Sequence, residues 1–229
     1  WPSIAVYFYR DEWIMGDIYY QQALFEEIYK HGYNPIIFYG QYGSNPRVGI
    51  PNMKLSMNHL FGKDVFPFDV LINTCKFSYQ SLGAQTLEEL KLQDVPIIQG
   101  YTIYMDEKTW AADPQGVTPL DVNLSISQPE LDGVIQGGVV ACQTFDERGH
   151  YVYLPVKERI AAIVERAIKW SKLRHIPVSE RKVVIILHNY PPKNSNIGSA
   201  AGLDTPESVR RLLQSMQDEG YTVDTVPET

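Results

Sequence analysis

The sequence predicts an α/β fold of two parallel-sheet units, each Rossmann- or flavodoxin-like, joined by a long helix, with the second unit truncated. Three observations predict it: short apolar runs that alternate with helical periodicity, a restart of that pattern at residue 182, and one long helical stripe between the two parts. Strands that are apolar on both faces indicate a parallel sheet covered by helices on both sides.

The first unit begins with IAVYFYR (4–10), which is predicted to be a strand. Residues 16–33 carry apolar side chains at helical spacing and end near Gly32, a residue type suited to the position after a helix. NPIIFYG (34–40) is the next predicted strand. The expected sheet continues with DVLINT (69–74) and VPIIQGY (95–101), and short helices are expected at 55–61 and 85–93.

The segment 106–145 breaks this alternation. It contains a helix-like run at 106–113 and two strand-like runs, VNLSIS (122–127) and GGVVACQTF (137–145), separated by the turn PELDG. A glycine-ended turn that exposes two carboxylates at the end of the sheet is a place where α/β proteins bind ligands.

The connecting segment and the second unit are predicted from the same hydrophobic periodicity. Residues 155–177 carry one apolar helical stripe, and 182–190, 205–219 and 222–226 are expected as strand, helix and strand. HGYNPIIFYG and EGYTVDTVPE occupy the same place in the two units. We therefore expect an α/β domain with a PELDG-bearing insertion at 1–150, a connecting helix at 151–180 and the start of a second α/β domain at 181–229.

Composition excludes several classes of protein. The chain has 229 residues, 44% of them apolar, which suffices for a core, and its net charge of −7 with scattered Lys and Arg argues against nucleic acid or an anionic membrane as partner. No apolar run reaches about eighteen residues, so no membrane span is expected. Cys75 and Cys142 lack metal-ligand spacing, which favours buried thiols and a cytoplasmic location. Both ends look cut, as in a piece of a longer polypeptide.

The loop 188–208 lies between a predicted strand and a predicted helix, where many α/β proteins bind phosphate. A Walker loop needs a lysine after its second glycine, but Gly202 is followed by Leu-Asp, and no G-x-G-x-x-G is present. Nucleotide binding is therefore disfavoured. Thr205-Pro206 is predicted as the N-cap and first residue of the following helix.

Three side chains in these loops have two interpretations each. His188, beside Asn189 at the end of a predicted strand, is either structural or a ligand and proton carrier, since free imidazole titrates near pH 6.5. Glu130 and Asp132 are either solvated turn residues or carboxylates that accept protons or hold a hard cation. No second His or Cys lies at ligand spacing, so a permanent closed metal site is not expected.

Long, ordered motifs carry a resemblance to a known family. SQPELDGVIQ, PVKERIAAIVERAIKWSKLR and KVVIILHNYPPKNSNIGSAAGLDTPESVRRLLQSMQDEGY resemble the large subunit of the cobaltochelatase and magnesium-chelatase H family over residues 106–229. The first hundred residues fit more loosely, through FYRDEWIMGD and VPIIQGY. GLDTPES is closer to the cobaltochelatase branch.

The resemblance implies a role in metal insertion. The large subunit of that family binds the tetrapyrrole and hosts insertion, as part of a ligase that forms nitrogen–metal bonds in cobalamin biosynthesis. Separate AAA+ ATPase subunits use ATP, which agrees with the missing phosphate loop. No tightly bound cofactor is implied for this chain; the divalent metal, cobalt or magnesium, is a substrate. The segment alone is expected to be inactive.

The resemblance also implies roles for particular residues. PELDG falls on Glu130 and Asp132, and the strand-end HNYPP motif falls on His188 and Asn189. Insertion removes pyrrole N–H protons, for which Glu130 is the first candidate, with His188 as the second catalytic residue. The expected transient metal ligands are Glu130, Asp132 and His188, and the expected substrate-binding residues are Asp132, Asn189, Asn196, Gly198 and Ser199.

Three other functions remain open at this stage. The first is magnesium insertion into protoporphyrin in place of cobalt insertion into a corrin precursor. The second is a non-catalytic small-molecule binding module of two α/β lobes. The third, a nucleotide-dependent enzyme, is disfavoured by the missing phosphate motifs.

Overall fold

A computed structural model describes residues 1–41, 44–62, 66–79 and 94–227 of the chain. The chain divides into two compact units, Trp1–Ser171 and Lys172–Thr229. The helix expected at 85–93 lies outside the described residues.

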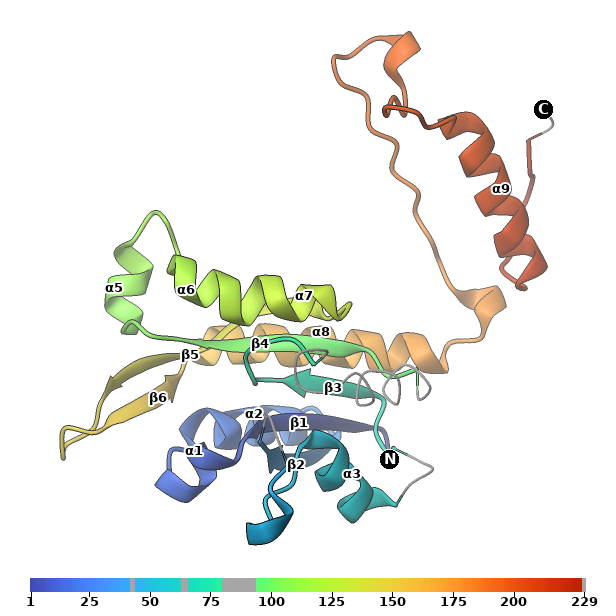
Figure 1. Ribbon diagram of the computed structural model, residues 1–229. Helices are drawn as coiled ribbons and strands as arrows, with labels where there is room; N and C mark the ends of the chain where they lie inside the picture. Colours follow the sequence, from blue (N-terminus) through green and yellow to red (C-terminus); the bar gives the residue numbers. More distant parts are fainter. Residues whose placement is uncertain (42–43, 63–65, 80–93, 228–229) are drawn as a thin grey trace. The chain divides into compact units, whose positions relative to one another are not determined.

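The first unit is built on a six-stranded sheet in the order β2-β1-β3-β4-β5-β6 (Figure 1). Its first five strands are parallel, and β6 pairs antiparallel with β5 as a hairpin. The prediction of a mostly parallel sheet is thus confirmed. The strands are β1 (Ser3–Tyr9), β2 (Asn34–Gly40), β3 (Val70–Asn73), β4 (Ile97–Ile103), β5 (Ile135–Phe145) and β6 (Tyr151–Pro155).

Helices accompany both faces of this sheet. The residue expected to follow the first long helix, Gly32, has a φ of +78° directly after its end, a conformation that glycine adopts without strain. The helical elements of this unit are α1 (Arg10–Met15), α2 (Tyr19–Lys30), η1 (Pro46–Val48), α3 (Met53–Phe61), α5 (Glu107–Ala112), α6 (Pro119–Asp121), η3 (Val122–Ser127), α7 (Gln128–Leu131) and α8 (Lys157–His175).

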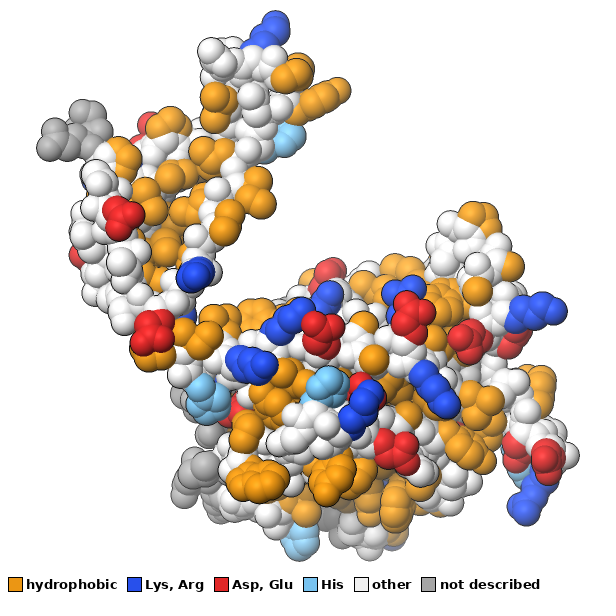
Figure 2. All heavy atoms as spheres, turned by 180° about the vertical axis from the view of Figure 1, so that it is seen from behind, with side chains coloured by type: hydrophobic (Ala, Val, Ile, Leu, Met, Phe, Trp, Pro, Cys, Tyr) orange, Lys and Arg blue, Asp and Glu red, His pale blue; other side chains and the backbone are white. Residues whose placement is uncertain are grey.

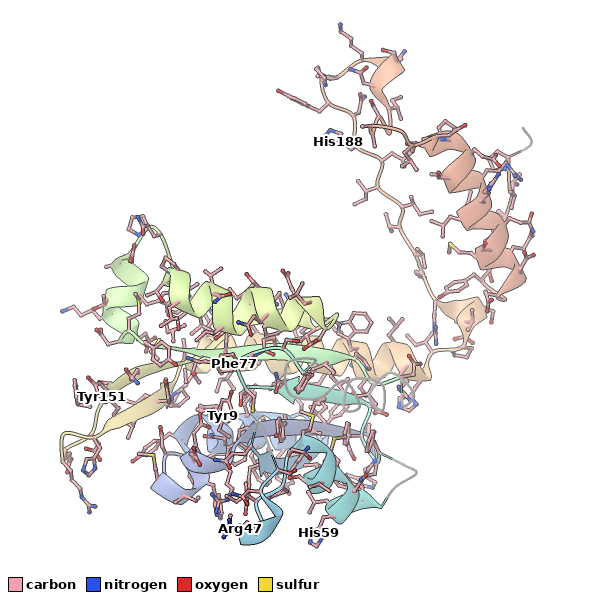
Figure 3. All side chains as sticks on the ribbon, viewed as in Figure 1. Tyr9, Arg47, His59, Phe77, Tyr151 and His188 are labelled. Carbon is pink, nitrogen blue, oxygen red and sulfur yellow. The ribbon has the colours of Figure 1, made fainter. Side chains whose placement is uncertain are left out.

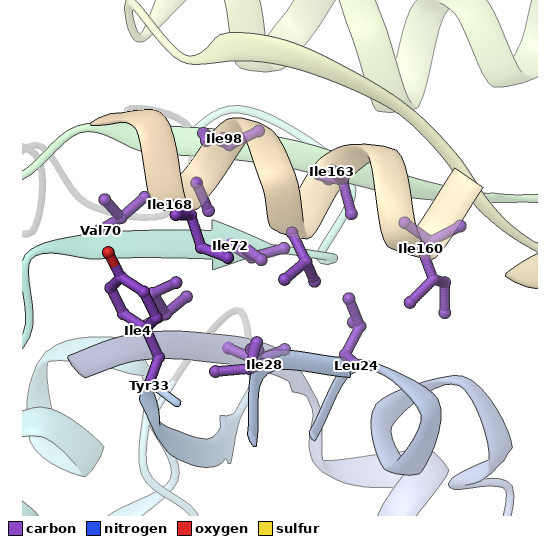
Figure 4. Close-up of a cluster of buried hydrophobic side chains, with 14 of the residues drawn as sticks. Ile4, Leu24, Ile28, Tyr33, Val70, Ile72, Ile98, Ile160, Ile163 and Ile168 are labelled. Atoms are coloured by element: carbon purple, nitrogen blue, oxygen red, sulfur yellow. The ribbon is translucent and has the colours of Figure 1, made fainter. Parts of the chain in front are cut away.

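The core has two parts because successive side chains of a strand point to opposite faces of the sheet. Ile4 and Val6 pack with one cluster and Ala5 and Tyr7 with the other. The first cluster joins strands β1, β3 and β4 to α2 and to the apolar stripe of α8 (Figure 4). The second joins the opposite face to α3 and to the segment after β3. Burial on both faces explains why these strands are almost entirely apolar.

One predicted strand of the first unit is a helix. VNLSIS forms a π-helical stretch, η3, continuous with α6 and α7. Thr118 caps this helix by accepting a hydrogen bond from the Asp121 backbone N–H at 3.1 Å, and Pro119 occupies a first-turn position. The polar residues Asp121 and Ser125, four apart, form its fully buried positions. The alternation of Val, Leu and Ile in VNLSIS therefore does not indicate a strand here. The N-cap at Thr118 is the sequence signal that predicts the helix.

The second unit differs from its prediction. Among its described residues it contains α9 (Thr205–Asp218), two short 3-10 turns, η4 (Val178–Glu180) and η5 (Asn194–Asn196), and no strand. Neither KVVIIL nor TVDTV pairs with a strand in the part of the chain that the structure describes, so a second Rossmann-like sheet is not confirmed. Exposure alternates along the first of these runs: Val184 and Ile186 are 82% and 87% exposed, whereas Ile185 is 36% exposed. This alternation is typical of a strand without neighbours.

Replacing Ile186 by lysine is expected to reduce self-association of the polypeptide, because an apolar extended run without strand partners pairs readily with other chains. The free energy of unfolding should stay within about 0.5 kcal/mol, since the side chain is exposed. Light scattering over a concentration series and urea unfolding measure the two effects. Ile185→Lys is the matched comparison and should be the more destabilising change. Unchanged self-association of Ile186→Lys would contradict the expectation.

Candidate functional site

The PELDG carboxylates lie at the amino end of a strand. Glu130 belongs to α7, and the turn at Asp132 leads directly into β5, which is parallel to its neighbour β4. Figure 1 shows α7 running back across the sheet toward the end where β1 begins. The sequence placed this turn at an end of the sheet, and the structure specifies which end. It is opposite to the carboxyl ends of the strands, where parallel sheets hold ligands.

Asp132 ties two segments of the first unit together. One carboxylate oxygen accepts a hydrogen bond from the Ser78 hydroxyl at 2.7 Å, and the other accepts one from the Tyr79 backbone N–H. Tyr79 is buried with Val95 and Val134, which precede β4 and β5, so the segment after β3 runs back over this face. Glu130, by contrast, is exposed, and its side chain makes no hydrogen bond or ion pair with the described residues.

The remaining predicted site residues lie in the second unit. His188 is exposed, with its ring 6.2 Å from that of Tyr190, and its carbonyl accepts a hydrogen bond from the Gly198 N–H. The Asn189 side chain accepts from the Lys193 N–H at 3.3 Å, and Asn196 donates to the Pro191 carbonyl at 2.8 Å. These bonds fold residues 188–198 into a closed loop.

The NIGSAAG loop is fixed to the start of α9. The Gly198 carbonyl accepts from the Thr205 hydroxyl, and a Cβ at Gly198, which has a φ of +69°, would collide with that threonine. The Ser199 backbone N–H donates to the Asn196 carbonyl at 3.0 Å, and its exposed side chain is open to a ligand. Asp204 is the N-cap, one residue before the predicted position, because its carboxylate accepts from the Glu207 N–H at 3.1 Å.

A group of charged side chains that the sequence analysis missed lies at the carboxyl end of β1. This strand leads through α2 to β2 on one side, while β3 lies on its other side, which makes it the switch point where open α/β sheets bind ligands. One oxygen of Glu12, Oε2, accepts hydrogen bonds from the Tyr20 hydroxyl and the Gln21 amide, both at 2.6 Å. Tyr20 also lies 3.0 Å from the Thr74 hydroxyl, just after β3.

Lys76 adds a buried positive charge to this group. The residue is 6% exposed, and its Nζ lies 3.4 Å from the centre of the Tyr104 ring and 3.9 Å from Asp121 Oδ1. Within the described parts of the chain, neither that Nζ nor that Oδ1 has a hydrogen-bond partner. Buried polar atoms normally have hydrogen-bond partners, so this ion pair has capacity to bind water or a polar ligand group.

The segment that carries Lys76 is held in a strained conformation. Phe77, labelled in Figure 3, has a φ of +69°. Such a φ is rare for a bulky residue. Its N–H donates to the Leu124 carbonyl at 2.7 Å, and the N–H of Lys76 donates to the Tyr9 hydroxyl at 3.1 Å. Together with the bonds to Asp132, these contacts from β1, η3 and the PELDG turn fix the position of Lys76.

The sequence profile of the CobN/Magnesium Chelatase family matches residues 1–229. The chain belongs to this family. It is 32% identical over 99% of its length to an uncharacterised protein of Methanocaldococcus jannaschii. It is 30% identical over 69% of its length to the aerobic cobaltochelatase subunit CobN of Pseudomonas aeruginosa, and 26% identical over 99% to the H subunit of magnesium chelatase from Rhodobacter capsulatus.

A solved structure extends the likeness to the fold. The catalytic subunit of cobaltochelatase from Mycobacterium tuberculosis matches 99% of this chain at 29% identity with a TM-score of 0.79. The chain covers 19% of that structure, and between 13% and 20% of the three relatives named above. It therefore spans about a fifth or less of the chelatase subunits that it matches.

Burial sets the protonation of Glu12 in this chelatase-family chain. Burial raises its pKa from the ordinary 4.5 to about 8. The hydrogen bond from Tyr20, the charge of Lys76 and the Gln21 amide lower it, whereas the nearby charge of Asp17 raises it. A carboxyl group of this kind gains or loses its proton close to neutral pH. Strongly shifted carboxyl groups in a ligand-binding region are candidates for acid–base chemistry.

A cavity of about 780 Å³ opens between the α1–α2 junction and the β5–β6 hairpin, and Asp17, whose charge acts on Glu12, is among its lining residues. Met15, Asp17 and Tyr19 line one side of it, and Phe145 and Tyr151 line the other. A second cavity of about 720 Å³, mainly apolar, lies between β2 and α3. Both have the volume of small-molecule sites.

No group of three His, Cys, Asp or Glu side chains among the described residues is arranged to hold a metal ion, and none of their helices is long and apolar enough to cross a membrane. On the face drawn in Figure 2, positive and negative side chains are interspersed. The sequence signal that points to Glu12 was the segment FYRDEWIMGD, which the family resemblance includes.

Proposed function

We propose that this chain is part of the tetrapyrrole-binding large subunit of a cytoplasmic, ATP-dependent chelatase that inserts cobalt into a corrin precursor. The match of the family profile to all 229 residues is the observation that carries this proposal. The names of the CobN relative and of the solved neighbour, both cobaltochelatase subunits, support the cobalt branch. The absence of a Walker motif from the sequence supports ATP use by partner subunits of the AAA+ class.

The reaction defines what the residues must do. A divalent ion replaces two pyrrole N–H protons, so a base must accept protons and the ion must exchange its water ligands. The exposed carboxylate of Glu130 is available as proton acceptor or transient metal ligand. The imidazole of His188 is available for the same two roles.

The other predicted residues have supporting roles in this proposal. Both oxygens of Asp132 accept hydrogen bonds within the fold, which favours a role in positioning the PELDG turn; its role as a transient ligand stays a prediction. The polar groups of the second unit's loop would bind the side groups of the macrocycle. These are Asn189, Asn196, Gly198 and Ser199.

Magnesium insertion into protoporphyrin is the second candidate function. Magnesium-chelatase H subunits are among the relatives, one of them aligned with 99% of the chain. Titration of the full-length subunit with a metal-free corrin precursor (hydrogenobyrinic acid diamide) and with protoporphyrin, followed by absorbance and tryptophan fluorescence, distinguishes the two. Micromolar binding of the corrin precursor alone would support the cobalt branch. Binding of neither ring would overturn the chelatase function, and a non-catalytic binding module would replace it.

Glu130→Gln is expected to retain macrocycle binding and to reduce the rate of metal insertion at least about a hundredfold, the usual contribution of a positioned acid–base group. The assay uses the full-length subunit with its ATPase partners, ATP and metal. Glu158→Gln, which removes an exposed carboxylate of α8, is the matched control and should retain the parent rate. An unchanged rate in Glu130→Gln would remove Glu130 from the site. His188→Ala tests the second candidate in the same assay.

A further inference from the structure

Several ionisable side chains with no role in the proposed function lie around Glu12, at the opposite end of the sheet from the PELDG turn. The site combines a titratable carboxyl group, a buried lysine without a hydrogen-bond partner among the described residues, and a strained segment that holds the lysine in place. Nothing in the fold requires such groups here, because apolar side chains would pack at lower cost.

The two oxygens of Glu12 differ in their surroundings. Oε2 is held by Tyr20 and Gln21, which fixes the orientation of the carboxyl group. Oε1 has no hydrogen-bond partner among the described residues, and it is not one of their enclosed polar atoms that lack a partner. Oε1 is therefore the less enclosed of the two oxygens. A carboxyl group with one oxygen anchored and the other free is arranged to exchange a proton with a ligand.

The surface beside Glu12 suits a flat apolar ligand. The helix that carries it, α1, has no buried residue, and three consecutive large side chains on it are exposed: Trp13 by 53%, Ile14 by 58% and Met15 by 76%. The ring of Trp13 stacks on that of Tyr39 at 6.0 Å, which gives a rigid aromatic surface. Met15 also lines the cavity of about 780 Å³.

We propose that Glu12 accepts a ring N–H proton during metal insertion, at a macrocycle site formed by the carboxyl ends of β1 and β3, with Tyr20 and Gln21 positioning its carboxyl group. This assignment rests on the proposed chelatase function and is the alternative to Glu130, which lies at the other end of the sheet and cannot reach the same ring nitrogen. The proton moves from the ring nitrogen to Oε1, and the electron pair of the broken N–H bond stays on nitrogen to form the bond to the metal. Two protons leave the ring for each divalent ion; Glu12 takes one of them and the second passes to solvent.

The groups that face Glu12 determine how its activity depends on pH. They are Asp17 after α1, Tyr20 on α2, Cys75 and Lys76 after β3, and Tyr153 on β6. Glu12 must lose its proton before it can accept one, so the insertion rate should rise with pH up to about 8. Removal of the positive charge in Lys76→Met should move this rise to higher pH. Removal of the negative charge in Asp17→Asn should move it to lower pH.

The decisive experiment measures insertion by the full-length subunit, with ATPase partners, as a function of pH. Glu12→Gln keeps the size and hydrogen-bonding shape of the side chain. It is expected to bind the metal-free macrocycle with the parent Kd, to insert metal about a hundredfold more slowly, and to lose the rise toward pH 8. Tyr20→Phe should retain a rate above that of Glu12→Gln with a shifted pH profile, as expected for a positioning residue. Glu158→Gln is the control for loss of a carboxylate.

A second readout does not depend on activity. Carbon-13 NMR of glutamate-labelled protein should show one carboxyl group that titrates near pH 8 and is absent from Glu12→Gln. Parent-like insertion by Glu12→Gln would overturn the assignment while parent macrocycle binding keeps the chelatase function. Loss of macrocycle binding in Glu12→Gln would also overturn it, because a proton acceptor is not required for affinity. Failure of the parent subunit to bind any tetrapyrrole would overturn the chelatase function itself.

Discussion

Asp132→Ala is expected to lower the free energy of unfolding of the first unit by about 3 kcal/mol or more, because hydrogen bonds to a charged group contribute about 1.5–3 kcal/mol each and the substitution removes at least two. The Ser78 hydroxyl and the Tyr79 N–H would each lose their hydrogen bond to this carboxylate, and both residues are buried. Urea unfolding followed by tryptophan fluorescence measures the change.

Glu130→Ala is the matched control for this prediction. The two carboxylates are two residues apart in the same turn, but Glu130 is exposed and its side chain contacts no polar partner among the described residues. Its removal should alter the free energy of unfolding by no more than about 0.5 kcal/mol. Equal effects of the two substitutions would contradict the structural role of Asp132 and would return it to the group of ligand candidates.

The different roles of Glu130 and Asp132 could not be predicted from the PELDG motif alone. A turn that contains two carboxylates and a glycine looks the same whether its acidic groups face solvent or accept hydrogen bonds from another segment. The partners of Asp132 are 53 and 54 residues away in sequence, so no local pattern identifies them. The two acidic residues of one motif therefore have different structural roles that only the fold distinguishes.

The parallel sheet, by contrast, was predictable strand by strand. Its strands are buried on both faces, and such strands have to be short and almost entirely apolar, as 4–10 and 69–74 are. The same rule failed for KVVIIL, because an apolar run specifies a strand only where other strands are present to pair with it. It failed for VNLSIS because the cap at Thr118 starts a helix that continues through the apolar alternation.

The charged residues around Glu12 were hidden for a related reason. On the sequence, Asp11 and Glu12 look like the solvated first turn of a helix, and Lys76 looks like a solvated residue after a strand. Glu12 and Lys76 are covered where α1, α2 and the segment after β3 meet, and Lys76 also packs on Tyr104, whereas Asp11 stays exposed. Strand order, which brings the ends of β1 and β3 together, was not derivable from spacing alone.

Glu12→Gln is expected to stabilise the protein above pH 8 although it removes the proposed proton acceptor. The folded protein binds the Glu12 proton more tightly than the unfolded chain does, since the pKa is about 8 when folded and about 4.5 when unfolded. Below pH 4.5 both states carry the proton and its effect is absent. Between pH 4.5 and 8 only the folded state keeps it, so this group makes stability fall as pH rises. Above pH 8 the buried charge imposes its full cost.

The size of this effect follows from the same difference in proton affinity. A tenfold change corresponds to about 1.4 kcal/mol, and solvent screens part of the charge of this partly exposed carboxyl group, so the neutral amide should gain roughly 2–4 kcal/mol over the parent protein above pH 8 and nothing near pH 4. Urea unfolding of both proteins at a series of pH values measures the gain, with Glu158→Gln as the control that should show no such trend. Equal stability of Glu12→Gln and parent above pH 8 would show that the carboxyl group is not desolvated. A gain in stability with a loss of insertion would indicate that this end of the sheet is arranged for proton transfer at the expense of stability.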